Sequence, residues 1–217
     1  MNVKKVLAIM FALALMFSFV ACSDDDDPAP ATSSSSVSTA SSGGTASSGG
    51  SGGTGASDLF ISEYFEPTTG NNKFIEIYNG TGSAVTLSAY TLSSYPNGAT
   101  DPSAVEVALT QYGATLANGS LIVLSPDDAA WYTTADIKVA YVSGSPVHFN
   151  GNDPVGLFKS GTLIDIVGTP GDTTDHIKDM KLVRNAGKGP ATTWVIGDWT
   201  QGTATETDIG TIGAHTY

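Results

Sequence analysis

The stretch LFISEYFEPTTGNNKFIEIYNG, residues 59–80, carries the pattern from which the fold of this chain is predicted. In its second half, from Phe74 to Tyr78, isoleucine alternates with aromatic and acidic residues, which is the two-residue period of a β-strand. The first half has the aromatic and β-branched composition of a strand. We therefore predict strands over residues 59–64 and 73–78, joined by a loop.

Further strand-like segments follow at short intervals, and they cover residues 85–92, 105–109, 120–124, 138–142, 155–158, 162–167 and 180–183. Asn-Gly pairs beginning at residues 79, 97, 118 and 150 are expected to supply the positive φ of tight turns, and Ser160-Gly161 marks a hairpin tip. Only residues 126–132 offer a short helix. Many short strands without alternating helices predict an all-β, immunoglobulin-like antiparallel β-sandwich.

The predicted sandwich occupies residues 58–217, which is long enough for one domain with its own core. Before it, residues 28–57 consist almost entirely of Ser, Gly, Thr, Ala and Pro. Such a composition buries too little apolar surface to fold, so residues 22–57 are expected to form a flexible tether, of which residues 28–57 alone reach about 30 Å on average.

Four ordered blocks of the sequence resemble the lamin tail domain: residues 59–92, residues 149–168, KLVRNAG at 181–187, and Trp199 with IGTIGAHTY at 209–217. The resemblance implies the immunoglobulin-like sandwich of that family. Bacterial members are commonly attached to extracellular nucleases, phosphatases and other hydrolases. No such enzyme domain accompanies the resemblance in this sequence, so we expect the domain without the hydrolase.

The first 21 residues have the layout of a signal peptide, with the basic start MNVKK followed by an apolar run over residues 6–21. A helix over this run would reach about 24 Å, short of the ~30 Å hydrocarbon layer, which favours cleavage over a permanent span. The segment Phe19 to Cys22 resembles the lipobox of bacterial lipoproteins, which implies a diacylglycerol on Cys22. The alternative is an unrelated cysteine beside an ordinary cleavage site.

The residues after this cysteine are Ser23, Asp24, Asp25, Asp26 and Asp27. Four adjacent carboxylates beside a membrane repel one another and anionic headgroups. The sequence resembles the signal that exports some Gram-negative lipoproteins to the outer face of the outer membrane. We therefore expect an outer membrane lipoprotein exposed on the cell surface, with a merely soluble start of the tether as the alternative.

The chain carries a formal net charge of −12, which disfavours nucleic acid and anionic lipid surfaces as partners. We expect contact with the membrane through the lipid anchor alone, an unknown protein or glycan partner, and a monomer. Neither a cofactor nor a catalytic motif is expected, because the sequence has no nucleophile elbow, no Ser-x-x-Lys and no phosphate-binding glycine loop.

Glu63 and Glu76 lie on neighbouring predicted strands and have the residue types of an acid–base pair. The interpretation that we prefer is structural: an outward-facing polar side chain, or an ion pair with Lys73.

The metal-binding signals are also open to a second interpretation. His148, His176 and His215 lack the spacing of a zinc site. Two loops hold hard oxygen ligands that suit calcium, while Asn and Asp also occur in loops for turn geometry alone; these residues are Glu66, Asn71, Asn72, Asn150, Asn152 and Asp153. No metal site is predicted.

Aromatic residues could form a contact surface or fill the core. Trp194 and Trp199 are predicted to belong to the core or its rim, whereas Trp131 and Tyr132 are the candidates for an exposed contact. The function that we predict is a non-catalytic, lipid-anchored binding or scaffold module. The alternatives are an accessory module of an extracellular hydrolase system and, with no supporting residues, a stand-alone hydrolase.

Overall fold

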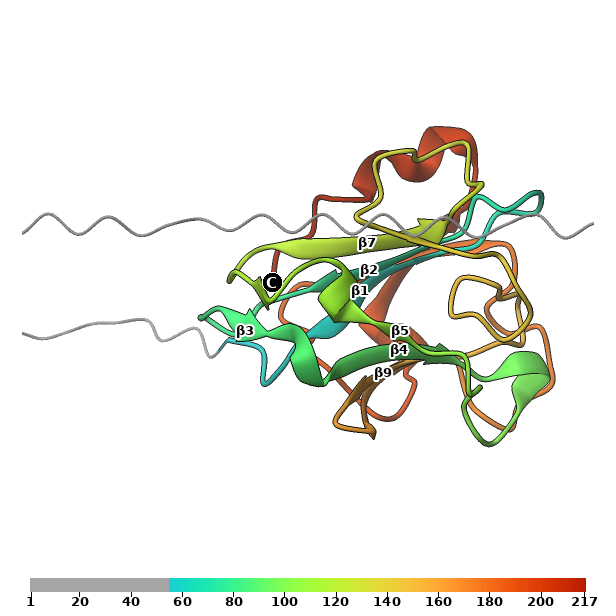
Figure 1. Ribbon diagram of the computed structural model, residues 1–217. Coiled ribbons are helices and arrows are strands. Elements are labelled where there is room, and N and C mark those ends of the chain that lie inside the picture. The colour runs from blue at the N-terminus through green and yellow to red at the C-terminus, as the bar shows by residue number, and fades with distance from the viewer. Residues whose placement is uncertain (1–54) are drawn as a thin grey trace, which may run out of the picture. The chain divides into compact units, whose positions relative to one another are not determined.

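The computed structural model describes residues 55–217, which form an all-β domain (Figure 1). The strands are β1 (Phe60–Phe65), β2 (Phe74–Tyr78), β3 (Val85–Thr86), β4 (Tyr90–Ser94), β5 (Val107–Ala108), β6 (Thr115–Leu116), β7 (Leu121–Pro126), β8 (Ile137–Val139), β9 (Val155–Lys159), β10 (Thr162–Val167), β11 (Met180–Arg184) and β12 (Trp199–Thr203). Short 3₁₀ segments are η1 (Leu87–Ala89), η2 (Pro96–Gly98), η3 (Leu109–Gln111), η4 (Ile196–Asp198) and η5 (Glu206–Thr211).

Two sheets lie face to face, with β1, β2 and β7 in one layer and β4, β5 and β9 in the other (Figure 1). The first sheet has six strands in the order β12-β11-β1-β2-β7-β8, and the second has four in the order β10-β9-β4-β5. β3 and β6 form a separate two-stranded ribbon. The strands pair antiparallel except β7 and β8, which are parallel. The prediction of an immunoglobulin-like sandwich is confirmed.

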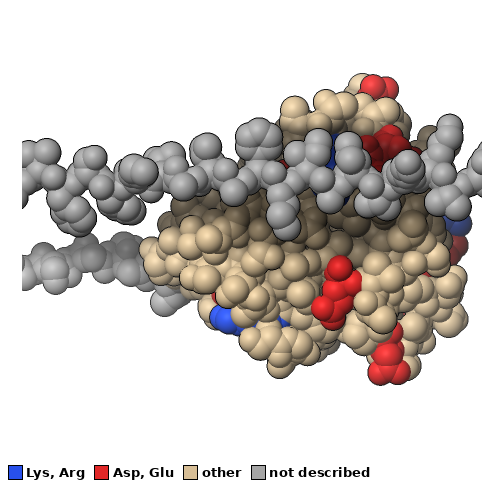
Figure 2. All heavy atoms as spheres, in the orientation of Figure 1, with Lys and Arg blue, Asp and Glu red and all other residues tan. Residues whose placement is uncertain are grey.

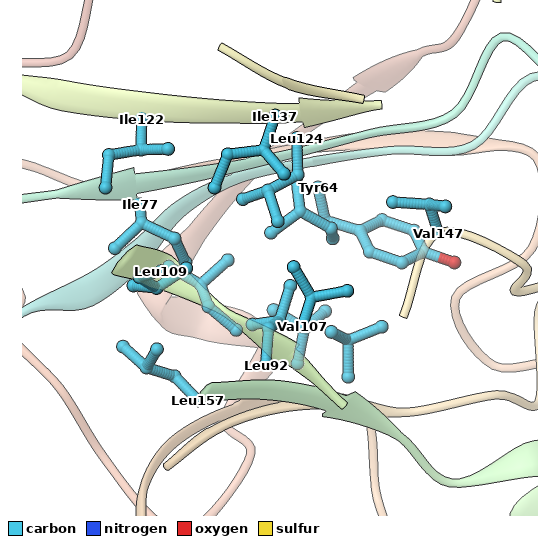
Figure 3. Packing of buried hydrophobic residues seen from close by; sticks show 14 of the residues in the cluster. Tyr64, Ile77, Leu92, Val107, Leu109, Ile122, Leu124, Ile137, Val147 and Leu157 are labelled. Carbon is cyan, nitrogen blue, oxygen red and sulfur yellow. The ribbon is translucent and has the colours of Figure 1, made fainter. Parts of the chain in front are cut away.

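The main core fills the space between the two sheets (Figure 3). Ile77 and Leu124 of the six-stranded sheet point toward Leu92 and Leu157 of the four-stranded sheet, and all four are fully buried. Alternation along β2 places one set of residues in this core because successive side chains of a strand point to opposite faces.

The opposite face of the six-stranded sheet is also covered. A second apolar cluster there contains Phe65, Phe74 and Val123, together with Ala204 and Ile212 from the end of the chain. The loop after β7 and the segment 204–217, which we call the C-terminal strap, lie over this face (Figure 1). Both faces of β1 and β2 are therefore buried, although the sequence of β2 alternates as if one face met water.

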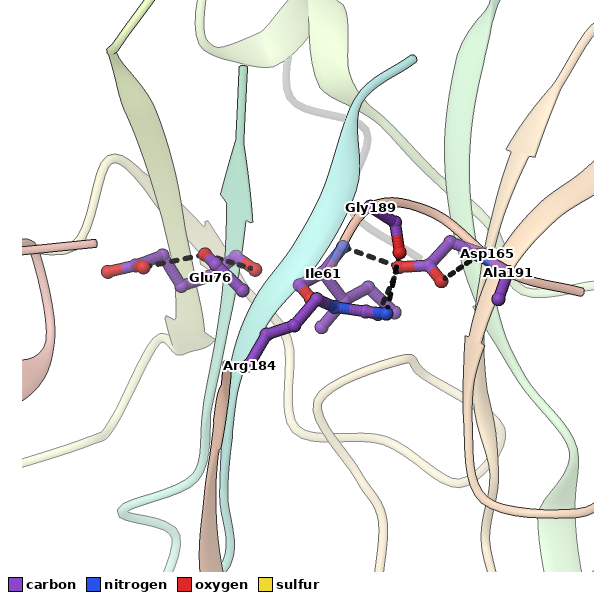
Figure 4. Close-up of polar contacts among 7 residues, drawn as sticks. Ile61, Glu76, Asp165, Arg184, Gly189 and Ala191 are labelled. Carbon is purple, nitrogen blue, oxygen red and sulfur yellow. Dashed lines mark hydrogen bonds and ion pairs between the residues drawn. The ribbon is translucent and has the colours of Figure 1, made fainter. Parts of the chain in front are cut away.

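A buried ion pair joins the two sheets (Figure 4). Arg184 of β11 donates from Nη2 to Oδ2 of Asp165 in β10 at 2.6 Å. The same carboxylate accepts the backbone N–H groups of Ile61 and Ala191, at 2.7 Å and 2.8 Å. Arg184 also donates to the backbone oxygens of Ile61 and Gly189 and lies 4.2 Å from the centroid of the Trp199 ring. Each of the two buried charges is therefore compensated by several protein groups.

Most predicted strands occur within a few residues of their predicted bounds. The single strand predicted over residues 85–92 is wrong, because η1 divides it into β3, paired with β6, and β4, in the four-stranded sheet. β6 and β12 were not predicted. The helix predicted over residues 126–132 is also wrong, because Pro126 ends β7 and a loop without helix follows. In this loop the Oδ1 of Asn72 accepts the N–H groups of Ala130 and Trp131.

The turn predictions hold at some positions only. Ser160 and Gly161 both have positive φ, as the hairpin tip requires, and so do Asn97 and Gly98. At Asn118-Gly119 only the glycine does. The pairs that begin at residues 79 and 150 have no positive φ, so the prediction is wrong there. Gly151 instead allows a close approach, because a Cβ at this position would lie 2.3 Å from Lys178 Cβ.

Candidate functional site

A groove of about 730 Å³ opens at one end of the domain. We call it the tyrosine groove, because Tyr78 at the end of β2 and Tyr217 of the C-terminal strap are its only aromatic residues. Its other lining residues are Asn118, Ala186, Gly55, Gly80, Gly82 and Gly187. No lining side chain carries a charge, and the small residues leave backbone atoms open to a ligand.

Asn79 organises one wall of the groove. Its buried side-chain amide donates to the backbone oxygens of Ser83 and Leu116, and its Oδ1 accepts the N–H of Thr81. The Asn118 Oδ1 in turn accepts the N–H of Gly82 at 2.7 Å. These bonds fix the loop after β2 against the loop after β6, so the wall does not depend on a bound ligand.

Tyr217 is held against the sheet by aromatic contacts. Its ring centroid lies 5.7 Å from that of Phe60, which also contacts Tyr78 and His215 at 5.6 Å each. A Cβ on Gly80 would come within 3.2 Å of both tyrosines, so glycine is the residue that lets the two rings approach the backbone there. Tyr217 nevertheless stays 38% exposed.

The first chain contacts of the domain form beside this groove. Ala56 is buried, and its N–H donates to the backbone oxygen of Gly80 at 2.9 Å. The described contacts thus begin two residues before Asp58, where the domain was predicted to start.

Glu63 and Glu76 are direct cross-strand neighbours in β1 and β2, and they are 2% and 1% exposed. The prediction of an outward-facing pair is wrong, because the C-terminal strap covers both carboxylates. Thr211 donates its hydroxyl to Glu63 Oε1 at 2.9 Å, and the Gly213 N–H donates to Glu76 Oε2 at 2.6 Å. The ion pair predicted with Lys73 is also wrong, because Lys73 contacts Glu66 instead.

Burial changes the acidity of these groups. It raises the pKa of Glu63 to about 7, an effect that the Thr211 hydroxyl opposes and the neighbouring Glu76 charge increases. Burial likewise raises the pKa of Glu76. Burial and the charge of Arg184 lower the pKa of His215 to about 4. Burial therefore favours the uncharged forms of the two glutamates beneath the strap and of His215 within it.

A second cavity of about 340 Å³ lies next to Glu63, with Arg184, Thr211 and His215 among its lining residues. It has two features of an acid–base site, a carboxyl group of raised pKa and a neutral imidazole. However, Arg184 is committed to Asp165, and the Glu63 carboxylate already accepts the Thr211 hydroxyl. The arrangement resembles a buried structural network more than a substrate site.

Most of the residues considered as calcium ligands form hydrogen bonds within and between the loops. Both oxygens of Asp153 accept backbone N–H groups, from Asn97 and Asn150, and the Asn71 amide donates to Asp128 at 2.6 Å. Asn152 donates from its amide to the Thr173 oxygen. Turn geometry accounts for these contacts, which leave few of the oxygens free.

Glu66 and Lys73 form a buried pair beside the ends of β1 and β2 that lie away from the tyrosine groove. Glu66 Oε2 accepts the Asp179 N–H at 2.9 Å, and burial raises its pKa to about 7. Lys73 donates to the Phe149 oxygen, and burial lowers its pKa. The fully buried Tyr64 hydroxyl has no hydrogen-bond partner among residues 55–217.

The histidines occupy unrelated surroundings. His148 contacts Tyr141 with 4.5 Å between ring centroids, and His176 accepts the Thr169 N–H. His215 is part of the strap and contacts Tyr78. Within residues 55–217 no group of three or more His, Cys, Asp or Glu is arranged to hold a metal ion.

The tryptophans divide as follows. Trp194 and Trp199 contact each other at 5.4 Å and belong to the main core, which confirms their prediction. Trp131 and Tyr132 were predicted to be an exposed contact, which is wrong: both are half-buried and pack edge-on against Phe65 and Phe74.

The predicted lipidation and export residues, Cys22, Ser23 and Asp24 to Asp27, lie outside the described residues 55–217. Of the helices in the part of the chain that the structure describes, none has the length and apolar character needed to cross a membrane. Figure 2 shows one face of the domain, on which uncharged residues predominate and acidic side chains are scattered.

Sequence reasoning missed the tyrosine groove, because Tyr78, Asn118 and Tyr217 are distant in the chain and no spacing connects them. It also missed the buried ion pair between Arg184 and Asp165.

In the comparisons with known proteins, the family model described as Lamin Tail Domain matches residues 53–171, more than half of the chain. The search of curated proteins found no match. The match ends before β11, β12 and the strap.

Proposed function

This chain belongs to the lamin tail domain family, and from that membership we propose that it is a non-catalytic binding module held at the cell surface by a lipid on Cys22. The family consists of immunoglobulin-like domains, and the sandwich described above is of that kind. Fold alone does not give a ligand. The proposal therefore depends on the residues of one site.

The observation that carries the binding role is the tyrosine groove. It combines an exposed aromatic ring with polar groups on a rigid wall, which is the usual composition of a binding site. The acid–base candidates, in contrast, are engaged in hydrogen bonds beneath the strap. Binding is thus better supported than catalysis.

The anchoring part of the proposal comes from the sequence. A diacylglycerol on Cys22, with an acylated amino terminus, supplies the several chains that stable membrane attachment needs. Residues 22–57 then act as the tether, and Ser23 with the four aspartates directs export to the outer face of the outer membrane. The net charge of −12 supports a monomer that does not bind nucleic acid.

Anchoring and export are tested separately in cells. Cys22→Ser is expected to release the protein from membranes. Replacing Asp24 to Asp27 with alanine is expected to leave it membrane-bound but hidden from protease added to intact cells. Membrane retention of Cys22→Ser would contradict the anchor, and unchanged protease access of the alanine variant would contradict the export signal.

Binding is tested by immobilising the purified full-length protein and passing over it the proteins and, separately, the polysaccharides of the cell envelope. Retention that falls in Tyr217→Ala but not in Tyr112→Ala supports the groove. Tyr112 is a matched control because it is 40% exposed and does not line the groove. Equal retention by both variants would contradict the proposal.

A further inference from the structure

We infer that the ligand of the tyrosine groove is a neutral glycan chain. This inference rests on the proposed function, because it names the ligand class of the same site. The first observation is charge. None of the lining side chains is charged, although the chain has a net charge of −12. A site without Arg or Lys does not compensate a phosphate, sulfate or uronate, and a site without Asp or Glu does not select a cation.

The second observation is the set of unused polar groups. The hydroxyls of Tyr78 and Tyr217 make no hydrogen bond to another described residue, and neither is buried without a partner. The oxygen of the Asn118 side chain is occupied by the Gly82 N–H, so its NH₂ group remains to donate. Phenol hydroxyls both donate and accept, and an amide NH₂ donates twice. Sugar hydroxyls also both donate and accept, so they can form hydrogen bonds with these groups.

The third observation is the position of the aromatic rings. The C–H face of a pyranose is apolar and flat enough to lie on an aromatic side chain. Tyr217 is an exposed residue of the groove lining, and its ring packs against Phe60 of the sheet. Because its contacts with Phe60 and the close approach at Gly80 already position the ring, little ordering is needed on binding.

The dimensions of the groove favour a short stretch of a chain over a protein surface. Its volume of about 730 Å³ is within the range of sites for small molecules. A stable protein interface needs about 800 Å² on each partner, with apolar anchors at its centre. The other large apolar side chains that are exposed on the described domain lie outside the groove: Val105, Tyr112, Val142, Val195 and Ile196.

The test uses the full-length protein and defined oligosaccharides of two to six hexose units. Neutral glucan, mannan and galactan fragments are compared with uronate-containing and sulfated fragments by glycan array and calorimetry. We expect binding of at least one neutral class. Tyr217→Ala should weaken it about tenfold, Tyr217→Phe should retain most of the affinity through the ring, and Asn118→Asp should weaken it severalfold while keeping an acceptor for the Gly82 N–H.

Tyr112→Ala serves as the control and is expected to bind like the wild type. Thermal unfolding of each variant separates a lost contact from a lost fold. Binding of charged fragments only, or binding that is unchanged in Tyr217→Ala, would overturn the glycan assignment. If a protein ligand is retained and lost with Tyr217→Ala while no glycan binds, the assignment fails and the binding function stands. If no ligand of either class depends on Tyr217, both fail.

Discussion

Arg184 and Asp165 form an ion pair of 2.6 Å whose side chains are only 2% and 0% exposed, and this pair links strands of two different sheets. Removing one partner leaves the other charge buried without compensation. Asp165→Asn is therefore expected to destabilise the domain by about 3–5 kcal/mol. Chemical denaturation measures this change.

Asp172→Asn is the control, because this carboxylate is partly exposed and contacts only nearby groups. A second comparison uses Arg184→Met with Asp165→Asn. The double variant should be less destabilised than the sum of the two single changes, since neither charge remains unpaired. Additive effects would show that the two residues act independently.

The Glu63 carboxyl makes stability depend on pH. Its pKa is about 7 in the folded domain and near 4.5 without burial, so the folded state holds more protons than the unfolded chain between these values. Stability from this group is present below pH 4.5 and is lost as the pH rises through 7. Glu63→Gln should therefore be more stable than the wild type above pH 7, by on the order of 3 kcal/mol, and nearly equal to it below pH 4.5.

The difference between the two proteins isolates Glu63 from other titrating groups nearby. His215 has a pKa of about 4 against its ordinary 6.5, so it acts in the opposite direction, but it is present in both proteins. Glu76, Lys181 and Arg184 are likewise present in both proteins. A difference between wild type and Glu63→Gln that does not change with pH would contradict the raised pKa.

Gly98 allows a close backbone contact that no other residue can make. Its φ is +67°, and a Cβ there would lie 2.3 Å from the backbone oxygen of Asp172. Gly98→Ala should therefore cost at least about 2 kcal/mol of unfolding free energy. Gly113→Ala is the control, because a Cβ on Gly113 would meet nothing within 4 Å, and it should change stability by less than about 0.5 kcal/mol. Similar losses in both variants would refute the steric argument.

The C-terminal strap is held by its apolar contact with the outer face of the six-stranded sheet. Ile212 is buried there with Phe65 and Phe74. Ile212→Asp is expected to detach the strap, because a buried carboxylate without a partner is strongly disfavoured. We expect increased binding of a dye that reports apolar surface, faster amide exchange in β1 and β2, and loss of Tyr217 from the groove. Thr207→Asp on the exposed side of η5 should show none of these changes.

Local pattern predicted the fold well because the strands and several turns are encoded by neighbouring residues. The alternation in β2 and the Ser160-Gly161 tip need no distant information. The burial of Glu63 and Glu76 could not be predicted this way, since it is caused by residues more than 130 positions later. One signal for that cover was present: Thr205 and Asp208 have the spacing of a capping box, which begins η5.

The groove and the ion pair share the same reason for having been missed. Tyr78 and Tyr217 are 139 positions apart in the sequence, and Asp165 meets Arg184 because β10 and β11 belong to two sheets that face each other. Contacts of this kind depend on the three-dimensional arrangement, and a single sequence contains no spacing from which they follow.

The order of the strands has a consequence for how the protein folds. β1, the first strand, lies between β2 and β11, and its register with β11 pairs Glu63 with Val183. The six-stranded sheet therefore cannot be completed until nearly the whole chain is available. Folding that waits for such distant pairings is slow, because chain closure must occur before the contacts that stabilise it. A chain emerging from the ribosome would remain without its complete central sheet until β11 and β12 arrive.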